Sequence, residues 1–196
     1  MAKIKINNII IGDKYPPAII VELGINHSGN LDKAIHLVDI AKKNGANIIK
    51  HQTHIPNEEM SSSAKNIIPG NAKESIFDVI NKNCLSLNKE KKLADYIRKK
   101  NMTFITTPFS FAAVDRLKEL KVPAIKIGSG ECNNYPLIKK IANLRLPVIL
   151  STGMNNYESI AKAVKILRNK KIKFALLQCT NVYPTPFEFI NINCVS

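Results

Sequence analysis

The stretch PVILSTG at residues 147–153 contains the pattern that decides the fold, a short apolar run that ends in hydroxyl residues and a glycine. Runs of this kind occur at six places in the 196-residue chain. They are Ala18–Leu23, Asn47–Gln52, Thr103–Thr107, Ala124–Ser129, Pro147–Thr152 and Phe174–Thr180. The runs are rich in Ile and Val and do not alternate with polar residues, which is typical of parallel strands buried on both faces.

The segments between these runs have helical periodicity and helix boundary signals. Asn44-Gly45 is a suitable stop for the first helix, and Ser110 is placed to cap the helix after the third run. Asn155 with Glu158 resembles a capping box ahead of the last helix. Because strands and helices alternate, the sequence predicts right-handed βαβ units and an α/β domain.

The number of strands distinguishes two α/β architectures. An eight-stranded barrel needs about 250 residues, whereas a doubly wound open sheet would be complete at this length. No Gly-rich phosphate loop follows the first run, and the tail Phe187–Ser196 forms no convincing final helix. We therefore predict an α/β fold of the (βα)8 TIM-barrel type that is incomplete, with about six strands and five helices present.

Two further segments lie outside the regular alternation. Ile4–Ile6 and Asn8–Ile11 are expected to form a small hairpin of the sort that closes the base of a barrel. The interval from Thr53 to Met102 is about twice as long as the others. We expect it to hold a long loop, a short helix near Glu74–Asn81 and a regular helix near Lys89–Lys100, and loops of this length are often functional.

Composition limits the class of protein. The net charge is +14, but no basic run is interleaved with aromatic residues, so we expect no nucleic-acid partner and attribute the charge to lysines on helix faces. No apolar run is long enough for a membrane span, and no signal peptide is evident, so we expect a cytoplasmic protein with no membrane partner. The four cysteines are widely spaced, and we expect reduced, mostly buried thiols.

Polar residues collect where the apolar runs end. In both α/β architectures the active site lies at the carboxyl ends of the strands. The candidate site residues are therefore Glu22, Lys50, Gln52, Thr107, Lys126, Ser129, Glu131, Ser151, Asn181 and Tyr183. Their recurrence at successive strand ends favours a functional site over a set of unrelated turn residues.

Two lysines in strands carry the chemical argument. Lys50 and Lys126 lie inside runs that are predicted to be buried, which is costly unless the ammonium group is paired or binds an anion. Lysines, hydroxyl groups and exposed backbone amides are suited to phosphate. A structural ion pair between Lys50 and Glu22 is the alternative, and Glu131 taken alone is compatible with a solvated loop carboxylate.

The histidines do not point to a metal site. His51 and His54 are close in sequence, but they do not have helical metal-ligand spacing. His51 is expected to face away from Lys50 and Gln52 on a regular strand. We interpret both histidines as structural or solvated and assign no metal ligand.

At these strand ends the chain resembles the sialic acid synthase family, and the resemblance covers about residues 15 to 188. The segments that carry it are Glu22–Gly29, Lys50–Thr53, Thr107–Phe109, Lys126–Cys132, Ser151–Met154 and Thr180–Pro186. They occur in the order and spacing of the family. The segments KHQTH and GSGECNNY are more similar to the sialic and legionaminic branches, which make N-acetylneuraminate and legionaminate, than to the pseudaminic branch.

The resemblance implies an activity and residue roles. The family condenses phosphoenolpyruvate with an N-acetylated sugar, such as N-acetylmannosamine, to a nine-carbon sialic-type acid and phosphate. By resemblance, Glu22, Gln52 and Tyr183 would meet the sugar, and Glu131 would assist proton movements, so that Glu22 and Glu131 are the implied catalytic residues. The residues implied to hold phosphoenolpyruvate are Lys50, Thr107, Lys126, Ser129, Ser151 and Asn181.

The resemblance also implies parts that this chain does not contain. The family uses a divalent metal, Mn or Mg, whose histidine ligands lie beyond residue 196. Two further barrel strands, a C-terminal antifreeze-like domain and contacts of the family homodimer lie there as well. We therefore expect residues 1–196 to form a partial TIM-barrel synthase domain with impaired activity.

Two other functions remain open from the sequence. A class I barrel aldolase would use Lys50 or Lys126 to form a Schiff base with a carbonyl substrate. A non-catalytic remnant or binding module would keep the fold without the reaction.

Overall fold

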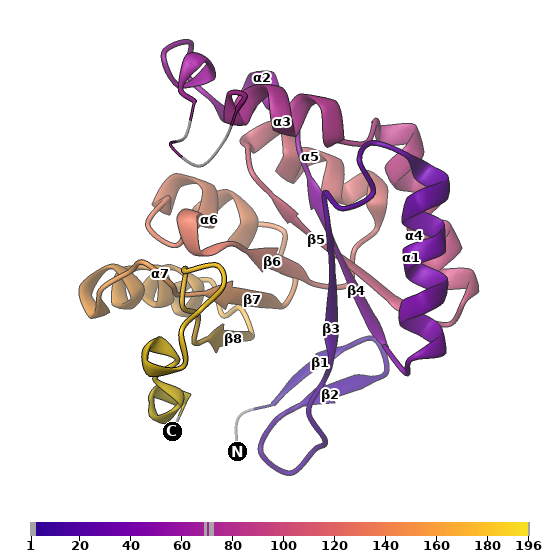
Figure 1. Ribbon diagram of the computed structural model, residues 1–196. Helices are drawn as coiled ribbons and strands as arrows, with labels where there is room; N and C mark the ends of the chain where they lie inside the picture. Colours follow the sequence, from indigo (N-terminus) through magenta and orange to yellow (C-terminus); the bar gives the residue numbers. More distant parts are fainter. Residues whose placement is uncertain (1–2, 69, 71–72, 196) are drawn as a thin grey trace. The chain divides into compact units, whose positions relative to one another are not determined.

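The computed structural model describes residues 3–68, 70 and 73–195 and divides the chain into two compact units, each of which is an α/β arrangement (Figure 1). Residues 16–123 are called the β3–β5 unit. Residues 124–196 together with residues 1–15 are called the β6–β8 unit. Each unit contains three of the six predicted parallel strands and the helices that follow them.

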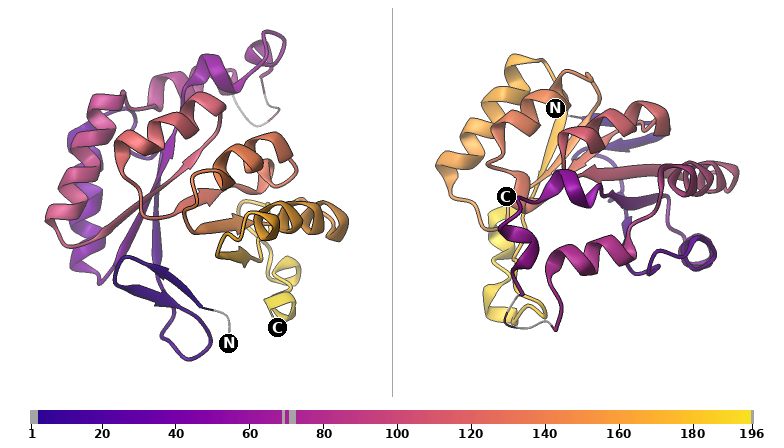
Figure 2. Two further views of the ribbon diagram at one scale, coloured as in Figure 1. Left: turned by 180° about the vertical axis from the view of Figure 1, so that it is seen from behind. Right: turned by 90° about the horizontal axis from the view of Figure 1, so that it is seen from above.

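The β3–β5 unit is built on three parallel strands, which pair in the order β3, β4, β5. They are β3 (Ile20–Gly24), β4 (Ile48–Thr53) and β5 (Thr103–Pro108). The main helices are α1 (Leu31–Lys43), α4 (Leu87–Lys99) and α5 (Phe111–Leu120). Helices α1 and α4 pack side by side, and α4 also packs against β5 (Figures 1 and 2). All six residues of β5 are buried, as the apolar sequence predicts.

The boundaries of α1 follow from its terminal residues. The Asn30 side chain accepts a hydrogen bond from the Lys33 amide at 3.0 Å, which caps the amino end. At the carboxyl end, the chain leaves the helix through Asn44 and then Gly45, whose φ of +84° is readily adopted by glycine. The predicted stop at Asn44-Gly45 is confirmed.

The long interval after β4 contains more regular structure than the sequence predicts. The short helix is confirmed as α3 (Ile76–Asn83), and α4 starts at Leu87. A four-residue helix, α2 (Pro56–Glu59), and a 3-10 turn, Ala64–Asn66, also lie in this interval. Four residues are too few to show a helical period, so α2 has no periodic signal, although Pro56 is suited to a first helical turn.

The β6–β8 unit combines a hairpin with three parallel strands. The predicted hairpin is confirmed as β1 (Ile4–Ile6) paired antiparallel with β2 (Ile9–Ile11). The parallel strands are β6 (Ile125–Ile127), β7 (Val148–Ser151) and β8 (Phe174–Leu177). Helices α6 (Tyr135–Ala142) and α7 (Tyr157–Asn169) pack against each other. Short 3-10 turns form at Ser129–Glu131, Phe187–Phe189 and Ile192–Val195.

The prediction that every apolar run is buried on both faces is wrong for β3, where only Leu23 is buried, and for β8. All four β7 residues are buried, whereas Phe174, Ala175 and Leu177 of β8 are half-buried and Leu176 is 45% exposed. Within the described part of this unit, β7 lies between β6 and β8, whereas β8 pairs with β7 alone. A strand with one neighbour keeps part of its surface in contact with solvent.

The capping box predicted at Asn155 and Glu158 is also wrong. The cap of α7 is Asn156, whose side chain accepts a hydrogen bond from the Ser159 amide at 2.9 Å. Asn155 instead donates from its side chain to the carbonyl oxygens of Ser129 and Gly153. Glu158 forms an ion pair with Lys162 one turn further along the helix. The cap therefore lies one residue later than the pattern indicates.

The cysteines are free, but only one of the four is buried. Cys132 is buried, Cys84 and Cys179 are half-buried, and Cys194 is exposed in the last 3-10 turn. The expectation of mostly buried thiols is therefore wrong, because the C-terminal turns keep their side chains exposed. In the part of the chain that the structure describes, no helix has the length and apolar character needed to cross a membrane.

Candidate active site

Three predicted site residues meet at the centre of the β3–β5 unit and, with Gln52, form what we call the Lys50 cluster. Lys50 is buried in β4, and its Nζ atom lies 2.6 Å from Glu22 Oε2 and donates to Thr107 Oγ1 at 3.3 Å. The parallel register explains this, because Glu22 pairs with Lys50 across β3 and β4. The Lys50–Glu22 ion pair that the sequence analysis names is therefore present. The Glu22 side chain is 58% exposed, so solvent screens the pair and leaves the carboxylate accessible.

Gln52 lies two residues further along β4, on the same strand face as Lys50. It is level with Thr107 of β5 in the strand register. Its Oε1 atom lies 3.2 Å from His54 Nε2, and His54 Nδ1 lies 2.8 Å from Glu59 Oε2. The predicted sugar-contacting residue is therefore in contact with His54, which is in turn held by Glu59, and the sequence singles out neither for this position.

The alternate face of β4 carries a buried polar group. His51 is buried, faces away from Lys50 as predicted, and places Nε2 3.2 Å from Oε1 of the buried Glu90. The ring centroid of His27 lies 5.4 Å from that of His51. Burial, together with the proximity of His51, lowers the pKa of His27 from 6.5 to about 4. His27 is therefore neutral at pH 7. The group formed by His27, His51 and Glu90 packs α4 against β4.

The β6–β8 unit contains a second polar group, which we call the Lys126 cluster and define as Lys126, Ser129, Ser151 and Asn181. Lys126 is buried in β6, and its Nζ atom donates to the Ile127 carbonyl oxygen at 2.9 Å and to Ser151 Oγ at the end of β7. A buried ammonium group beside a hydroxyl at the carboxyl end of two strands matches the expected anion-binding chemistry.

Ser129 and Asn181 join this cluster through Gly153. Ser129 Oγ accepts a hydrogen bond from the Gly153 amide at 3.1 Å. A Cβ atom on residue 153 would lie 1.8 Å from Asn181 Oδ1 and 3.0 Å from the Cys179 carbonyl oxygen, so the Asn181 side chain keeps this position only beside glycine. Asn155 donates to the Ser129 carbonyl oxygen at 2.9 Å and fixes the loop after β6. The four candidate residues therefore form two contact groups, Lys126 with Ser151 and Ser129 with Gly153 and Asn181, which the backbone of residues 151–153 joins.

Two candidates are less integrated than predicted. The Glu131 side chain accepts a hydrogen bond from Asn134 at 2.7 Å, so it is ordered by the start of α6. Tyr183 is 89% exposed in the segment after β8. Among the described residues of its own unit, no hydrogen bond or ion pair joins the Tyr183 side chain to the Lys126 cluster, so its predicted role rests on the family resemblance.

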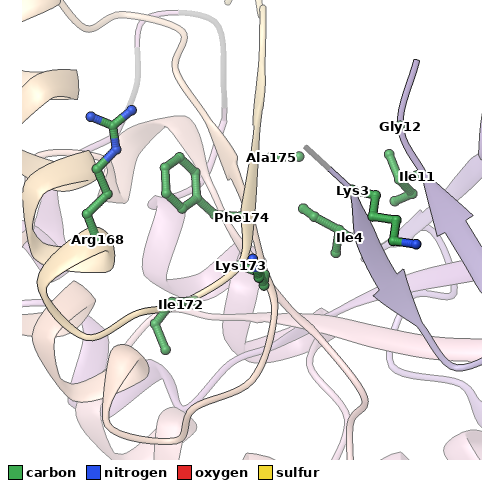
Figure 3. A pocket seen from close by; sticks show the side chains of 9 residues that line it. All are labelled: Lys3, Ile4, Ile11, Gly12, Arg168, Ile172, Lys173, Phe174 and Ala175. Carbon is green, nitrogen blue, oxygen red and sulfur yellow. The ribbon is translucent and has the colours of Figure 1, made fainter. Parts of the chain in front are cut away.

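The β6–β8 unit also contains a cavity of about 480 Å³ that none of the candidate residues lines. Figure 3 shows Ile4 and Ile11 of the hairpin on one side and Phe174 and Ala175 of β8 on the other. Lys3, Arg168 and Lys173 add positive charge. This cavity lies at the amino end of β8, opposite the strand ends that carry the Lys126 cluster, and agrees with the predicted place of the hairpin at the base.

The described residues do not match the divalent metal that the family resemblance implies. Within residues 3–68, 70 and 73–195, no group of three or more His, Cys, Asp and Glu side chains is arranged to hold a metal ion. His54 has Glu59 and Gln52 as its neighbours, and His51 has Glu90. His54 is therefore held by protein partners, whereas neither ring nitrogen of His51 has a hydrogen-bond partner among the described residues.

Comparison with known proteins gives a consistent family. The sequence pattern of the NeuB family matches residues 37–196. The chain is 39% identical over 185 residues to the N,N'-diacetyllegionaminic acid synthase of Campylobacter jejuni, covering 90% of this chain and 55% of that protein. It is 38% identical over 196 residues to an uncharacterised protein of Methanocaldococcus jannaschii, covering all of this chain and 55% of that protein. The chain thus spans about half the length of these relatives.

A solved structure shows the same fold. The sialic acid synthetase of Leptospira borgpetersenii serovar Hardjo-bovis, in complex with citrate, superposes with a TM-score of 0.88 at 33% identity. The match covers 98% of this chain and 64% of that one. The predicted α/β fold, an incomplete TIM barrel with six parallel strands, is confirmed, and so is the resemblance to sialic acid synthases.

Proposed function

The chain belongs to the NeuB family, and we propose that it forms the phosphoenolpyruvate-binding part of a synthase that condenses phosphoenolpyruvate with an N-acetylated sugar. The product would be a nine-carbon sialic-type acid, with phosphate released. The observation that carries the proposal is a buried lysine at a strand end in each unit, hydrogen-bonded to a hydroxyl group. Such groups favour an anion that carries both phosphate and carboxylate oxygens.

The proposed roles follow the two clusters and the family resemblance. Glu22, Gln52 and Tyr183 would contact the sugar, for which N-acetylmannosamine is the model substrate. Glu131, held by Asn134, would move a proton near the reacting carbons. The residues proposed to bind phosphoenolpyruvate are Lys50, Thr107, Lys126, Ser129, Ser151 and Asn181.

The proposed reaction is balanced without an external oxidant or reductant. The C3 carbon of phosphoenolpyruvate forms a bond to the aldehyde carbon of the sugar, and the aldehyde oxygen takes up a proton. Water then adds at C2, and the C2–O bond to phosphate breaks, so that the electron pair leaves with phosphate. The lysine ammonium groups bind the anionic groups of phosphoenolpyruvate and orient it. Binding thereby holds its C3 carbon close to the aldehyde carbon of the sugar. The described residues form no group suited to a metal ion, so no step is assigned through one.

The first test is a calorimetric titration of the 196-residue chain with phosphoenolpyruvate. Lys126→Met should weaken binding by roughly 10- to 100-fold, because it removes a charge-assisted contact worth about 1.5–3 kcal/mol. Lys139→Met is the matched control, since Lys139 is an exposed lysine of α6 in the same unit. Equal affinity of the Lys126 and Lys139 variants would contradict the proposed role of the Lys126 cluster.

A second measurement separates the synthase from the class I aldolase. The synthase route forms no covalent bond between a lysine and a substrate, whereas a class I aldolase forms a Schiff base between a lysine and its ketone donor, which borohydride reduces. Incubation with pyruvate and borohydride, followed by mass spectrometry, should leave Lys50 and Lys126 unmodified. A reduced pyruvate adduct on either lysine, absent from the exposed Lys139, would favour the aldolase.

A further inference from the structure

The segment after β4 places the His54 side chain against the predicted sugar-contacting residue Gln52, with Glu59 behind it. His54 is buried, its ring stacks on Phe109 with centroids 4.4 Å apart and planes inclined by 9°, and its two ring nitrogens face Glu59 and Gln52. Phe109 follows directly after β5. The imidazole is therefore fixed in position by a ring stack and by polar contacts at both nitrogens.

Glu59 is held as firmly as the ring it contacts. Its side chain is buried, Oε2 lies 2.8 Å from His54 Nδ1, and Oε1 accepts a hydrogen bond from the Ile55 amide. Helix α2, four residues long, brings Glu59 back toward the end of β4. A buried carboxylate that meets a ring nitrogen and accepts from a backbone amide orients the imidazole.

The contact with His54 orders the Gln52 amide. The Gln52 oxygen Oε1 faces His54 Nε2 at 3.2 Å, and an amide oxygen only accepts. His54 therefore donates from Nε2. The Gln52 amide group, with its oxygen engaged, then has its NH2 donors turned away from His54.

We propose that His54 and Glu59 are positioning residues that hold the Gln52 amide so that its NH2 group meets an acceptor oxygen of the sugar. This inference rests on the proposed function for the identity of the ligand. It assigns a recognition role to residues 54–59. The ligand group that meets Gln52 is then a hydrogen-bond acceptor, such as a carbonyl or hydroxyl oxygen. A His54 ring without a proton on Nε2 would require the opposite amide orientation and would present an acceptor to the sugar.

The first experiment does not depend on any ligand. In the isotope-labelled 196-residue chain at pH 7, the nitrogen resonances of His54 should be those of a ring that carries a proton on Nε2. His54→Phe keeps the stack on Phe109 and removes both nitrogens, and it should shift the Gln52 side-chain amide resonance. The control is His36→Asn, since His36 is an exposed histidine of α1. A His54 ring without a proton on Nε2, or a Gln52 resonance that His54→Phe leaves unchanged, would overturn the inference.

The second experiment separates this inference from the proposed function. Titration with N-acetylmannosamine should show about tenfold weaker binding for His54→Phe and Glu59→Gln, the equivalent of one hydrogen bond. Sugar binding by the double variant Gln52→Ala with His54→Phe should be no weaker than that by Gln52→Ala alone, while phosphoenolpyruvate binding stays unchanged in all four variants. Equal sugar affinity of wild type and His54→Phe would overturn the positioning role and leave the proposed function intact. Absence of sugar binding by the wild type would overturn the sugar assignment, and the resonance of Gln52 would then decide the positioning role alone.

Discussion

Strand β5 in the β3–β5 unit and strand β8 in the β6–β8 unit differ in how far their side chains are removed from solvent. Phe104 of β5 is 1% exposed and lies among six buried residues, whereas Leu176 of β8 is 45% exposed. Both strands are apolar in sequence. The difference teaches that an apolar run supplies the surface to be buried, while the elements packed against it decide how much is buried, and α4 and α5 both pack against β5. We therefore expect the stability of this chain to depend more on β5 than on β8.

The largest expected effect is at Phe104. Phe104→Ala should lower the free energy of unfolding by about 3–5 kcal/mol, because it removes a fully buried ring and leaves a cavity. Urea denaturation followed by circular dichroism measures this loss. The matched variant is Phe174→Ala in the half-buried β8, which should cost clearly less. Equal losses would show that β5 and β8 contribute equally and would remove the contrast.

The next effect concerns two carboxylates, one buried and one at the candidate site. Glu90 is buried beside His51, and its Oε2 atom lies 3.4 Å from Arg116. Glu90→Gln should destabilise the chain by about 3 kcal/mol, because it leaves a buried polar group and a cation without their charged partner. Glu131→Gln, at the start of α6, should leave the unfolding midpoint nearly unchanged. A large loss of stability from Glu131→Gln would identify Glu131 as a structural residue.

A pH effect should be confined to the β3–β5 unit, which contains all four histidines of the chain. The folded-state pKa of His27 is lowered from 6.5 to about 4, chiefly by burial. Between these values the unfolded chain binds more protons, so stability falls as the pH decreases from about 6.5 to about 4. The full shift corresponds to about 3 kcal/mol.

His27→Asn tests this pH dependence. Asn retains an acceptor near the position of His27 Nδ1, which accepts from the Gly29 amide at 3.2 Å. The difference in unfolding free energy between pH 7 and pH 4.5 should be smaller in the variant than in the wild type. Identical differences in both proteins would mean that other groups account for the acid sensitivity.

Much of the fold follows from local sequence signals. The six strands, the hairpin and the stop at Asn44-Gly45 are all confirmed, because apolar runs and turn residues report local preferences. Helix α2 and the cap at Asn156 could not be predicted, since a four-residue helix has no period and two adjacent asparagines compete for one cap. The partial exposure of β8 depends on which strands lie beside it, and this is a tertiary property.

The candidate site residues were predicted from residue type and from their place along the strands. The side chains that contact these residues were not predicted. Lys50 with Glu22 and Thr107, and Lys126 with Ser151, come together because parallel register aligns strand ends. His54 and Glu59 were missed, because a histidine and a glutamate five positions apart in a loop have no pattern of their own. The sequence signal that was available is the length of the interval after β4, which is typical of functional loops.

The smallest expected effect is at the exposed face of β8. Leu176→Gln should change the free energy of unfolding by no more than about 0.5 kcal/mol, because the side chain is already 45% exposed. The measurement is urea denaturation at two protein concentrations that differ by about 20-fold. If the loss instead approaches that of Phe104→Ala and grows with protein concentration, Leu176 is covered by a second copy of the chain in solution. A large loss that is independent of concentration would mean that another part of the same chain covers β8. The expected small, concentration-independent change would leave β8 as an apolar strand whose face is open to solvent, and this is the arrangement on which the contrast with β5 rests.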